Sequence, residues 1–209
     1  MSITNLKSLL VSAGLILSVM AVPVAAQESG KHRHGHINSP PPKVNAIKPL
    51  PIPKLTIPDV EVMDQDGRKQ KFYTDLVKGK IVVINFVFTT CKSMCPLLAT
   101  NFTQLQSALG ERLNKEVFLI SVSTDPETDS PEKMKTWSEK FKAKDGWTFV
   151  TGNKEQLTPL LQVFTGDGPR TGYHIPSLYV VNGSKNAHRP AYGFESAENV
   201  LKLIDEVTK

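Results

Sequence analysis

Residues 81–99 read IVVINFVFTTCKSMCPLLA, and they give the clearest indication of the fold. The run over 81–88 is almost wholly apolar and rich in β-branched side chains. Such a run predicts a central strand that is covered on both faces. The two cysteines of the chain, Cys91 and Cys95, follow at once. Pro96 suits the first turn of a helix, so we expect the order strand, cysteine pair, helix.

The predicted helix has an apolar face and a clear end. Apolar residues recur at helical spacing at Leu97, Leu98, Phe102, Leu105 and Leu109. Gly110 suits the helix end. If the helix begins near Cys91, the cysteines lie four residues apart on one face, so that their sulfurs can converge. The helix N-terminus and the neighbouring Lys92 would then favour thiolate over thiol.

The spacing of the cysteines favours a functional pair. A disulfide that closes only three intervening residues removes little entropy from the unfolded chain, so it would stabilise the fold weakly. Two thiolates are soft ligands, which prefer copper(I) or zinc to hard cations. Thiol exchange also requires a thiolate. Metal binding and redox chemistry therefore both remain open for Cys91 and Cys95.

The chain on either side of this centre alternates between predicted strands and helices. Residues 59–73 alternate polar and apolar about Asp66-Gly67, which predicts an N-terminal β-hairpin. Further strands are expected over 117–123, 147–151, 177–181 and 191–194, and helices from Ser130-Pro131, over 154–164 and over 197–208, the last capped by Ser196. This order predicts an α/β domain with a parallel or mixed sheet whose last two strands form an edge hairpin.

The N-terminal 26 residues have the pattern of a secretory signal. Lys7 precedes an apolar stretch over 9–22, and Val24-Ala25-Ala26 predicts cleavage after Ala26. The alternative is a membrane anchor through residues 9–22, because about 20 apolar residues can span a bilayer. Both interpretations place the folded part outside the cytoplasm, in the periplasm or facing it.

Residues 27–54 are rich in proline, histidine and lysine and predict a disordered linker ahead of one domain over 55–209. Within this linker, His32, His34 and His36 could capture a metal weakly or be solvated charge. Loss of residues 1–26 lowers the net charge from +5 to +4. The basic residues are interspersed with acidic ones and aromatic residues are few, which argues against nucleic-acid binding.

A third metal ligand would come from the two histidines of the predicted domain. His174 lies in GYHIPSLYVVNG, just before an apolar strand, at the kind of sheet edge where α/β proteins place ligand-binding groups. His188 lies in GSKNAHRP, which predicts an exposed polar turn. On the residues alone, His174 is either a metal ligand or, as is more common for a histidine, a surface or hydrogen-bonded structural residue, and His188 is left out of any site.

Three segments in order, KGKIVVINFVFTTCKSMCP, SVSTDPETDSPEKMKTW and HIPSLYVVN, resemble the Sco/SenC family of copper chaperones. The resemblance covers residues 57–208. It implies a thioredoxin-like fold with a C-x-x-x-C-P motif, a D-P-x-x-D-x-P segment and a distant histidine. The implied copper ligands are Cys91, Cys95 and His174.

The sequence also departs from the family pattern. Lys92 and Ser93 stand where the family commonly has proline and an acidic residue, Tyr173 precedes the histidine in place of aspartate, and Asn182 replaces a second aspartate. These changes spare the three implied ligands but alter their surroundings, which bears on metal affinity and choice of partner. IPSLYVVNG also resembles the thioredoxin loop whose proline, here Pro176, faces the redox cysteines.

Two functions follow from the resemblance. In the first, Cys91, Cys95 and His174 hold copper and deliver it to an exported or membrane acceptor, such as the oxidase subunit that carries a dinuclear copper site. In the second, Cys91 and Cys95 act as a thiol-disulfide oxidoreductase on the acceptor's cysteines. We favour the first, because a reductase has no evident use for His174. A peroxiredoxin is disfavoured because no proline precedes Thr89 and Thr90 at the required spacing.

Three further residues near these motifs have two interpretations each. Asp125 and Asp129 are either turn and capping residues or groups close to the site. Met94 could offer a thioether to copper, but a methionine there is more often a packing residue.

Overall fold

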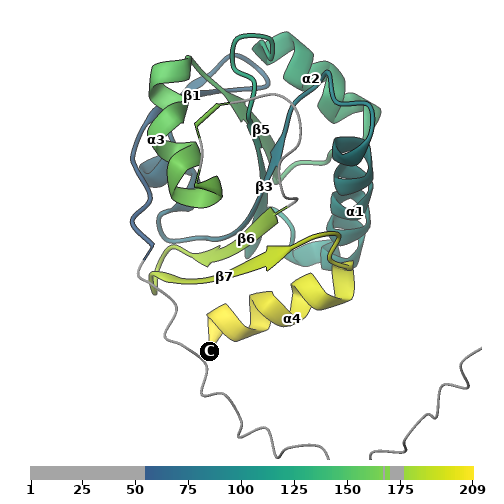
Figure 1. Ribbon diagram of the computed structural model, residues 1–209. Coiled ribbons are helices and arrows are strands. Elements are labelled where there is room, and N and C mark those ends of the chain that lie inside the picture. The colour runs from purple at the N-terminus through teal and green to yellow at the C-terminus, as the bar shows by residue number, and fades with distance from the viewer. Residues whose placement is uncertain (1–54, 167, 170–176) are drawn as a thin grey trace, which may run out of the picture. The chain divides into compact units, whose positions relative to one another are not determined.

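A computed structural model of the protein describes residues 55–166, 168–169 and 177–209, and these form a mixed sheet with helices on both faces (Figure 1). The predicted signal and the predicted linker, together with His174 and Pro176, lie outside the described residues. The strands are β1 (Glu61–Asp64), β2 (Lys69–Lys71), β3 (Ile81–Val87), β4 (Val117–Ser123), β5 (Trp147–Thr151), β6 (Ser177–Asn182) and β7 (Ala187–Tyr192). The helices are α1 (Met94–Leu109), α2 (Pro131–Lys140), α3 (Lys154–Thr165) and α4 (Ala197–Thr208), with a π-helical turn η1 (Phe72–Val77) and a short 3-10 turn η2 (Gly110–Arg112).

The sheet has the strand order β2-β1-β5-β4-β3-β6-β7. Its centre is parallel, because β4 pairs in parallel with both β3 and β5. The hairpins β1–β2 and β6–β7 flank this centre in antiparallel pairing. The predicted mixed α/β sheet, the N-terminal hairpin and the closing edge hairpin are confirmed.

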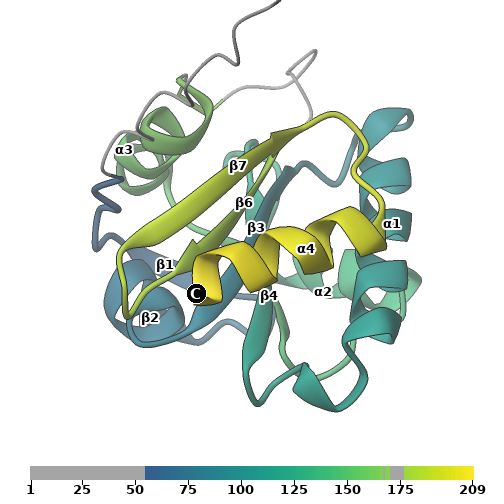
Figure 2. The same cartoon turned by 90° about the horizontal axis from the view of Figure 1, so that it is seen from below.

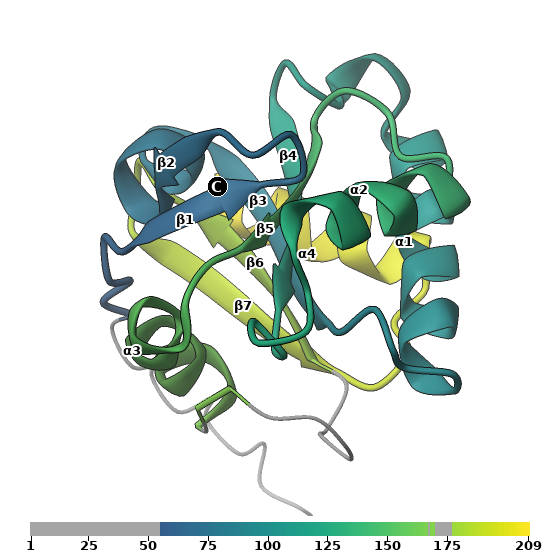
Figure 3. The same ribbon diagram turned by 90° about the horizontal axis from the view of Figure 1, so that it is seen from above.

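Two apolar cores lie on opposite faces of the sheet, as the alternation of β3 requires. Val83 and Val87 belong to the core beneath α1, α2 and α4, whereas Val82, Ile84 and Phe86 belong to the core beneath α3 and η1. The view from above shows α3 on one side of the sheet and α1 and α2 on the other (Figure 3). The predicted two-sided burial of this strand is confirmed.

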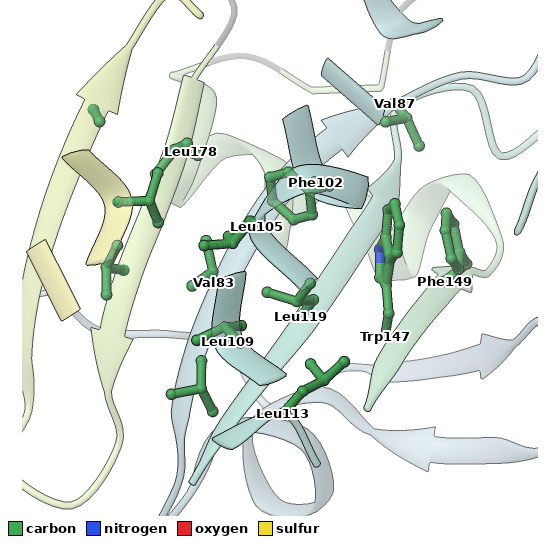
Figure 4. Close-up of a cluster of buried hydrophobic side chains, with 14 of the residues drawn as sticks. Val83, Val87, Phe102, Leu105, Leu109, Leu113, Leu119, Trp147, Phe149 and Leu178 are labelled. Atoms are coloured by element: carbon green, nitrogen blue, oxygen red, sulfur yellow. The ribbon is translucent and has the colours of Figure 1, made fainter. Parts of the chain in front are cut away.

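The core under α1 is the larger of the two and includes the aromatic residues of β5. Figure 4 shows Phe102, Leu105 and Leu109 of α1 gathered over Leu119 and Trp147 of the sheet. Seen from below, α4 lies alongside β6 and β7 and closes this core at the edge (Figure 2). This packing places α1, with Cys95 in its first turn, against the central strands.

Capping residues set the beginnings of the helices as the sequence indicates. The Ser130 hydroxyl accepts a hydrogen bond from the Lys133 N–H at 3.4 Å, and the Ser196 hydroxyl accepts one from the Asn199 N–H at 3.2 Å. Gly110 follows the last residue of α1 with a φ of 53°, a conformation that favours glycine. Each of these predicted boundaries is confirmed.

The last strand differs from its prediction. β7 begins at Ala187 and not at residue 191, and it pairs with β6 over its whole length, so that His188 lies opposite Val181. The expected exposed turn at His188 is therefore wrong, because the strand buries this side chain to 9% exposure. β7 is an edge strand and includes Pro190, a residue that only an edge strand tolerates well.

The buried His188 leads to a pH-dependent contribution to stability. Burial, together with the charge of Arg189, lowers the pKa of His188 below its ordinary 6.5. The neutral ring is favoured in the folded state. Its contribution to the free energy of unfolding is therefore complete above pH 6.5 and is lost as the pH falls through the lower pKa that His188 has in the folded state. We expect the melting temperature of His188→Gln to fall less than that of the wild type between pH 7.5 and pH 5. Parallel curves for the two proteins would contradict this assignment.

Candidate metal centre

The cysteine motif occupies the loop between β3 and the start of α1. The Cys91 N–H donates to the carbonyl oxygen of Phe88 at 3.1 Å, which closes a turn after the strand. α1 begins at Met94, so Cys91 precedes the helix and only Cys95 lies in its first turn. The expectation that both cysteines share one helical face is therefore wrong, because the turn at residues 89–91 delays the helix. Pro96 stands in the first turn, as predicted.

The sulfurs nevertheless come together, by a different route. The Cys95 N–H donates a hydrogen bond to Cys91 Sγ at 3.3 Å. Both cysteines are free thiols; Cys91 is half-buried and Cys95 is fully buried. One sulfur thus faces the surface while the other lies against the core under α1.

The two thiols differ strongly in acidity. Burial alone would raise the pKa of Cys91, but hydrogen bonds from the Cys95 thiol and from the N–H groups of Cys95, Ser93 and Met94 outweigh burial and lower it. Burial raises the pKa of Cys95 to about 12, with smaller contributions from its hydrogen bond to Cys91 and from the negative charge of Asp129. The predicted stabilisation of thiolate by N–H groups at the helix start therefore holds for Cys91 and not for Cys95.

Asp129 lies at the base of this loop. Its side chain is fully buried, and its Oδ1 atom accepts hydrogen bonds from the N–H and the hydroxyl of Thr89 at 3.0 and 2.6 Å. Ser130 and not Asp129 caps α2; the Asp129 carboxylate binds the cysteine loop through Thr89, and the Asp129 N–H also takes part in the turn at Asp125. Asp125 is a turn residue, whose carbonyl oxygen accepts from the Thr128 and Asp129 N–H groups. β3 and β4 are parallel and end at the same sheet edge, a signal that could have placed Asp129 beside Thr89.

The described residues supply two of the three expected ligands. Within the ranges that the structure describes, no cluster of three or more histidine, cysteine, aspartate or glutamate side chains is placed to hold a metal ion. Met94 is half-buried at the first position of α1. His188 is not placed for such a role, because it lies in β7, where it pairs with Val181 of β6. His174, the predicted third ligand, is outside these ranges.

The comparison with protein families gives a direct match. The family described as SCO1/SenC matches residues 53–208. The chain belongs to the SCO1/SenC family. The predicted family is therefore confirmed, and the residues matched include both cysteines and the whole sheet.

Similar proteins and solved structures support the same conclusion. A Stutzerimonas stutzeri protein named for copper binding is 33% identical over 159 residues, which are 71% of this chain and 76% of that protein. BsSco, described as a Sco family member with a disulfide switch, matches with a TM-score of 0.64 at 23% identity over 74% of this chain and 94% of its own. Yeast Sco1 with copper bound matches with a TM-score of 0.61 at 18% identity over 76% of this chain and 96% of its own. These two structures confirm the predicted thioredoxin-like Sco fold.

Across residues 55–166, 168–169 and 177–209, no helix is long and apolar enough to cross a membrane. The predicted signal or anchor over 1–26 precedes these residues and stays a prediction.

Proposed function

We propose that this SCO1/SenC protein binds copper through the thiolates of Cys91 and Cys95 and the imidazole of His174, and delivers it to an acceptor outside the cytoplasm. The acceptor we propose is an exported or membrane-bound oxidase subunit that carries a dinuclear copper site. The observation that supports this most is the pair of free thiols at the start of α1, where the Cys95 backbone N–H donates to Cys91 Sγ at 3.3 Å and the two thiols are hydrogen-bonded to each other.

The unequal exposure of the thiols suits transfer. Copper(I) prefers soft sulfur ligands, and a thiol must lose its proton to bind it. The half-buried Cys91, with its lowered pKa, would engage copper first, and the buried Cys95 would release a proton on completing the site. Departure can proceed in reverse through Cys91, the sulfur that an acceptor's ligands can reach.

A second candidate function rests on the same difference in exposure and pKa between the two thiols. A reactive, partly exposed thiol next to a buried thiol of high pKa is the arrangement of a thiol-disulfide oxidoreductase, in which the first sulfur attacks and the second resolves the mixed disulfide. Here Cys91 would attack and Cys95 would resolve. The disulfide switch for which BsSco is described gives this alternative support from a relative.

Replacement of His174 separates the two functions. The reduced wild-type protein should bind one copper(I) per chain, and His174→Ala should weaken the affinity at least about tenfold because one of three ligands is lost. Thiol exchange with a glutathione disulfide should be unchanged. Competition with a chromophoric copper(I) chelator measures the affinity, and His188→Gln is the control, since it removes a histidine from β7. Unchanged copper binding with lost exchange would favour the oxidoreductase.

We also propose that the folded domain works outside the cytoplasm. Lys7, the apolar stretch over 9–22 and the small residues before Gln27 support export. The mass of the protein recovered from the expressing cells distinguishes a mature chain that begins at Gln27 from a chain that keeps residues 9–22 as a membrane tether.

A further inference from the structure

The loop that carries Cys91 is held by hydrogen bonds at Thr89, Cys91 and Cys95. At its start, the Cys91 N–H donates to the Phe88 carbonyl, and at its end Cys91 Sγ accepts from the Cys95 N–H. Between these, Thr89 donates through both its N–H and its hydroxyl to Asp129. The Asp129 bonds are different in kind, because they tie the loop to a segment 40 residues further along the chain.

Asp129 is itself held firmly by the neighbouring strand ends. Its Oδ2 atom accepts from the Ser123 hydroxyl at 2.6 Å, and its carbonyl oxygen accepts from the Thr151 hydroxyl at 2.7 Å. Its N–H donates to the Asp125 carbonyl oxygen at 2.8 Å. The end of β4 thus binds the carboxylate and the end of β5 binds the backbone of the same residue, while the carboxylate in turn accepts from Thr89.

Other roles do not account for this carboxylate. Ser130 already caps α2, so Asp129 is not needed there. Among the ion pairs of the described residues, none includes Asp129. A buried carboxylate is costly to the folded state unless hydrogen bonds satisfy it, and Thr89 and Ser123 supply three. Its side chain is therefore committed to the loop and to β4.

We infer that Asp129 is a positioning residue, which sets where the Cys91 sulfur stands relative to Cys95 by holding Thr89 in place. Two groups that react or bind together gain from being held in one geometry, and the gain is lost when the support is removed. The inference deepens the proposed function where copper is concerned, but it also applies to the metal-free thiol pair.

The metal-free pair gives the primary test. Reduced protein and oxidised glutathione exchange to the Cys91–Cys95 disulfide and two molecules of reduced glutathione, so two thiols are oxidised as one glutathione disulfide is reduced. The equilibrium constant of this exchange measures how well the sulfurs are placed. We expect Asp129→Ala to lower it about tenfold or more, and Thr89→Val, which removes only the hydroxyl bond, to lower it about threefold.

Two further variants make the test specific to position. Asp129→Asn keeps an oxygen that accepts from Thr89 and should restore the constant to within about threefold of the wild type. Asp64→Asn is the matched control, because that carboxylate is equally buried but binds Arg68 and Gln70 within the β1–β2 hairpin. A constant for Asp129→Asn as low as that for Asp129→Ala, or an equal fall in Asp64→Asn, would overturn the inference. If Asp129→Ala does not fold, an unchanged constant in Thr89→Val overturns it.

Copper binding gives the second readout. If the proposed function holds, the copper(I) affinity of Asp129→Ala should fall about 10- to 100-fold, the usual effect of removing a group that orients a metal ligand. A wild-type protein that binds no copper, together with a shifted thiol equilibrium in Asp129→Ala, would reject the proposed function and support the positioning role. If the wild-type protein binds copper normally but the thiol equilibrium of Asp129→Ala is unshifted, the proposed function would be supported and the positioning role rejected.

Discussion

Iodoacetamide should modify Cys91 at least about 30-fold faster than Cys95 in the folded, metal-free protein at pH 7.5. The pKa of Cys91 lies below 9.0 and that of Cys95 is about 12, so their thiolate fractions differ by roughly a thousandfold. The greater intrinsic nucleophilicity of the more basic thiolate recovers about 30-fold of this difference. Burial of Cys95 adds to the remainder, because the reagent must also reach the sulfur. Mass spectrometry of a timed alkylation series measures both rates.

The pH dependence and the unfolded protein provide the controls for this experiment. As the pH rises, the rate at Cys91 should level off once the pH exceeds its lowered pKa, while the rate at Cys95 continues to increase, so the ratio of the two rates narrows. In concentrated guanidinium chloride the environments are lost, and the two cysteines should react at similar rates. Equal rates in the folded protein would show that the two thiols do not differ as the structure indicates.

Phe102→Ala should lower the free energy of unfolding by about 3–5 kcal/mol. The ring is 2% exposed, and its centroid lies 5.6 Å from that of Trp147 across the space between α1 and β5. Its removal leaves a cavity in the core under α1 that the parallel strands cannot collapse to fill. Because small domains have only about 5–15 kcal/mol of stability in total, the loss is large. Urea unfolding followed by tryptophan fluorescence measures it.

Leu97 provides the matched control on the same helix. Its side chain is 56% exposed, so Leu97→Ala should change the free energy of unfolding by less than about 0.5 kcal/mol. A loss below about 1 kcal/mol in Phe102→Ala would mean that this ring does not support the core. Comparable losses in the two variants would mean that the helix faces are assigned wrongly.

Local signals made most of the fold predictable. The apolar run of β3 needs no partner to be recognised, since its length and β-branched content are sufficient. Ser130 and Ser196 marked the starts of α2 and α4, because capping depends on residues within one turn. The family resemblance rested on the spacing of Cys91 and Cys95 and on the D-P-x-x-D-x-P segment, which are also local.

The errors arose where pairing or distance in sequence decides the structure. β7 reads AHRPAY, which has no apolar alternation, and only its pairing with β6 makes it a strand. Cys91 precedes α1 because a turn to Phe88 competes with the helix, a balance that spacing does not reveal. The hydrogen bond between Thr89 and Asp129 joins residues 40 positions apart, so the sequence around either residue does not predict it.

The two edge strands of the sheet, β2 and β7, determine whether copies of this domain can pair through their sheets. A fibril grows when the rim of one sheet accepts a strand from the next molecule. On one rim, Pro190 interrupts the row of amide donors that an incoming strand would need; on the other, β2 is only three residues long and two of them are lysine. Pairing between the outer strands of two molecules should therefore be disfavoured, even at high concentration.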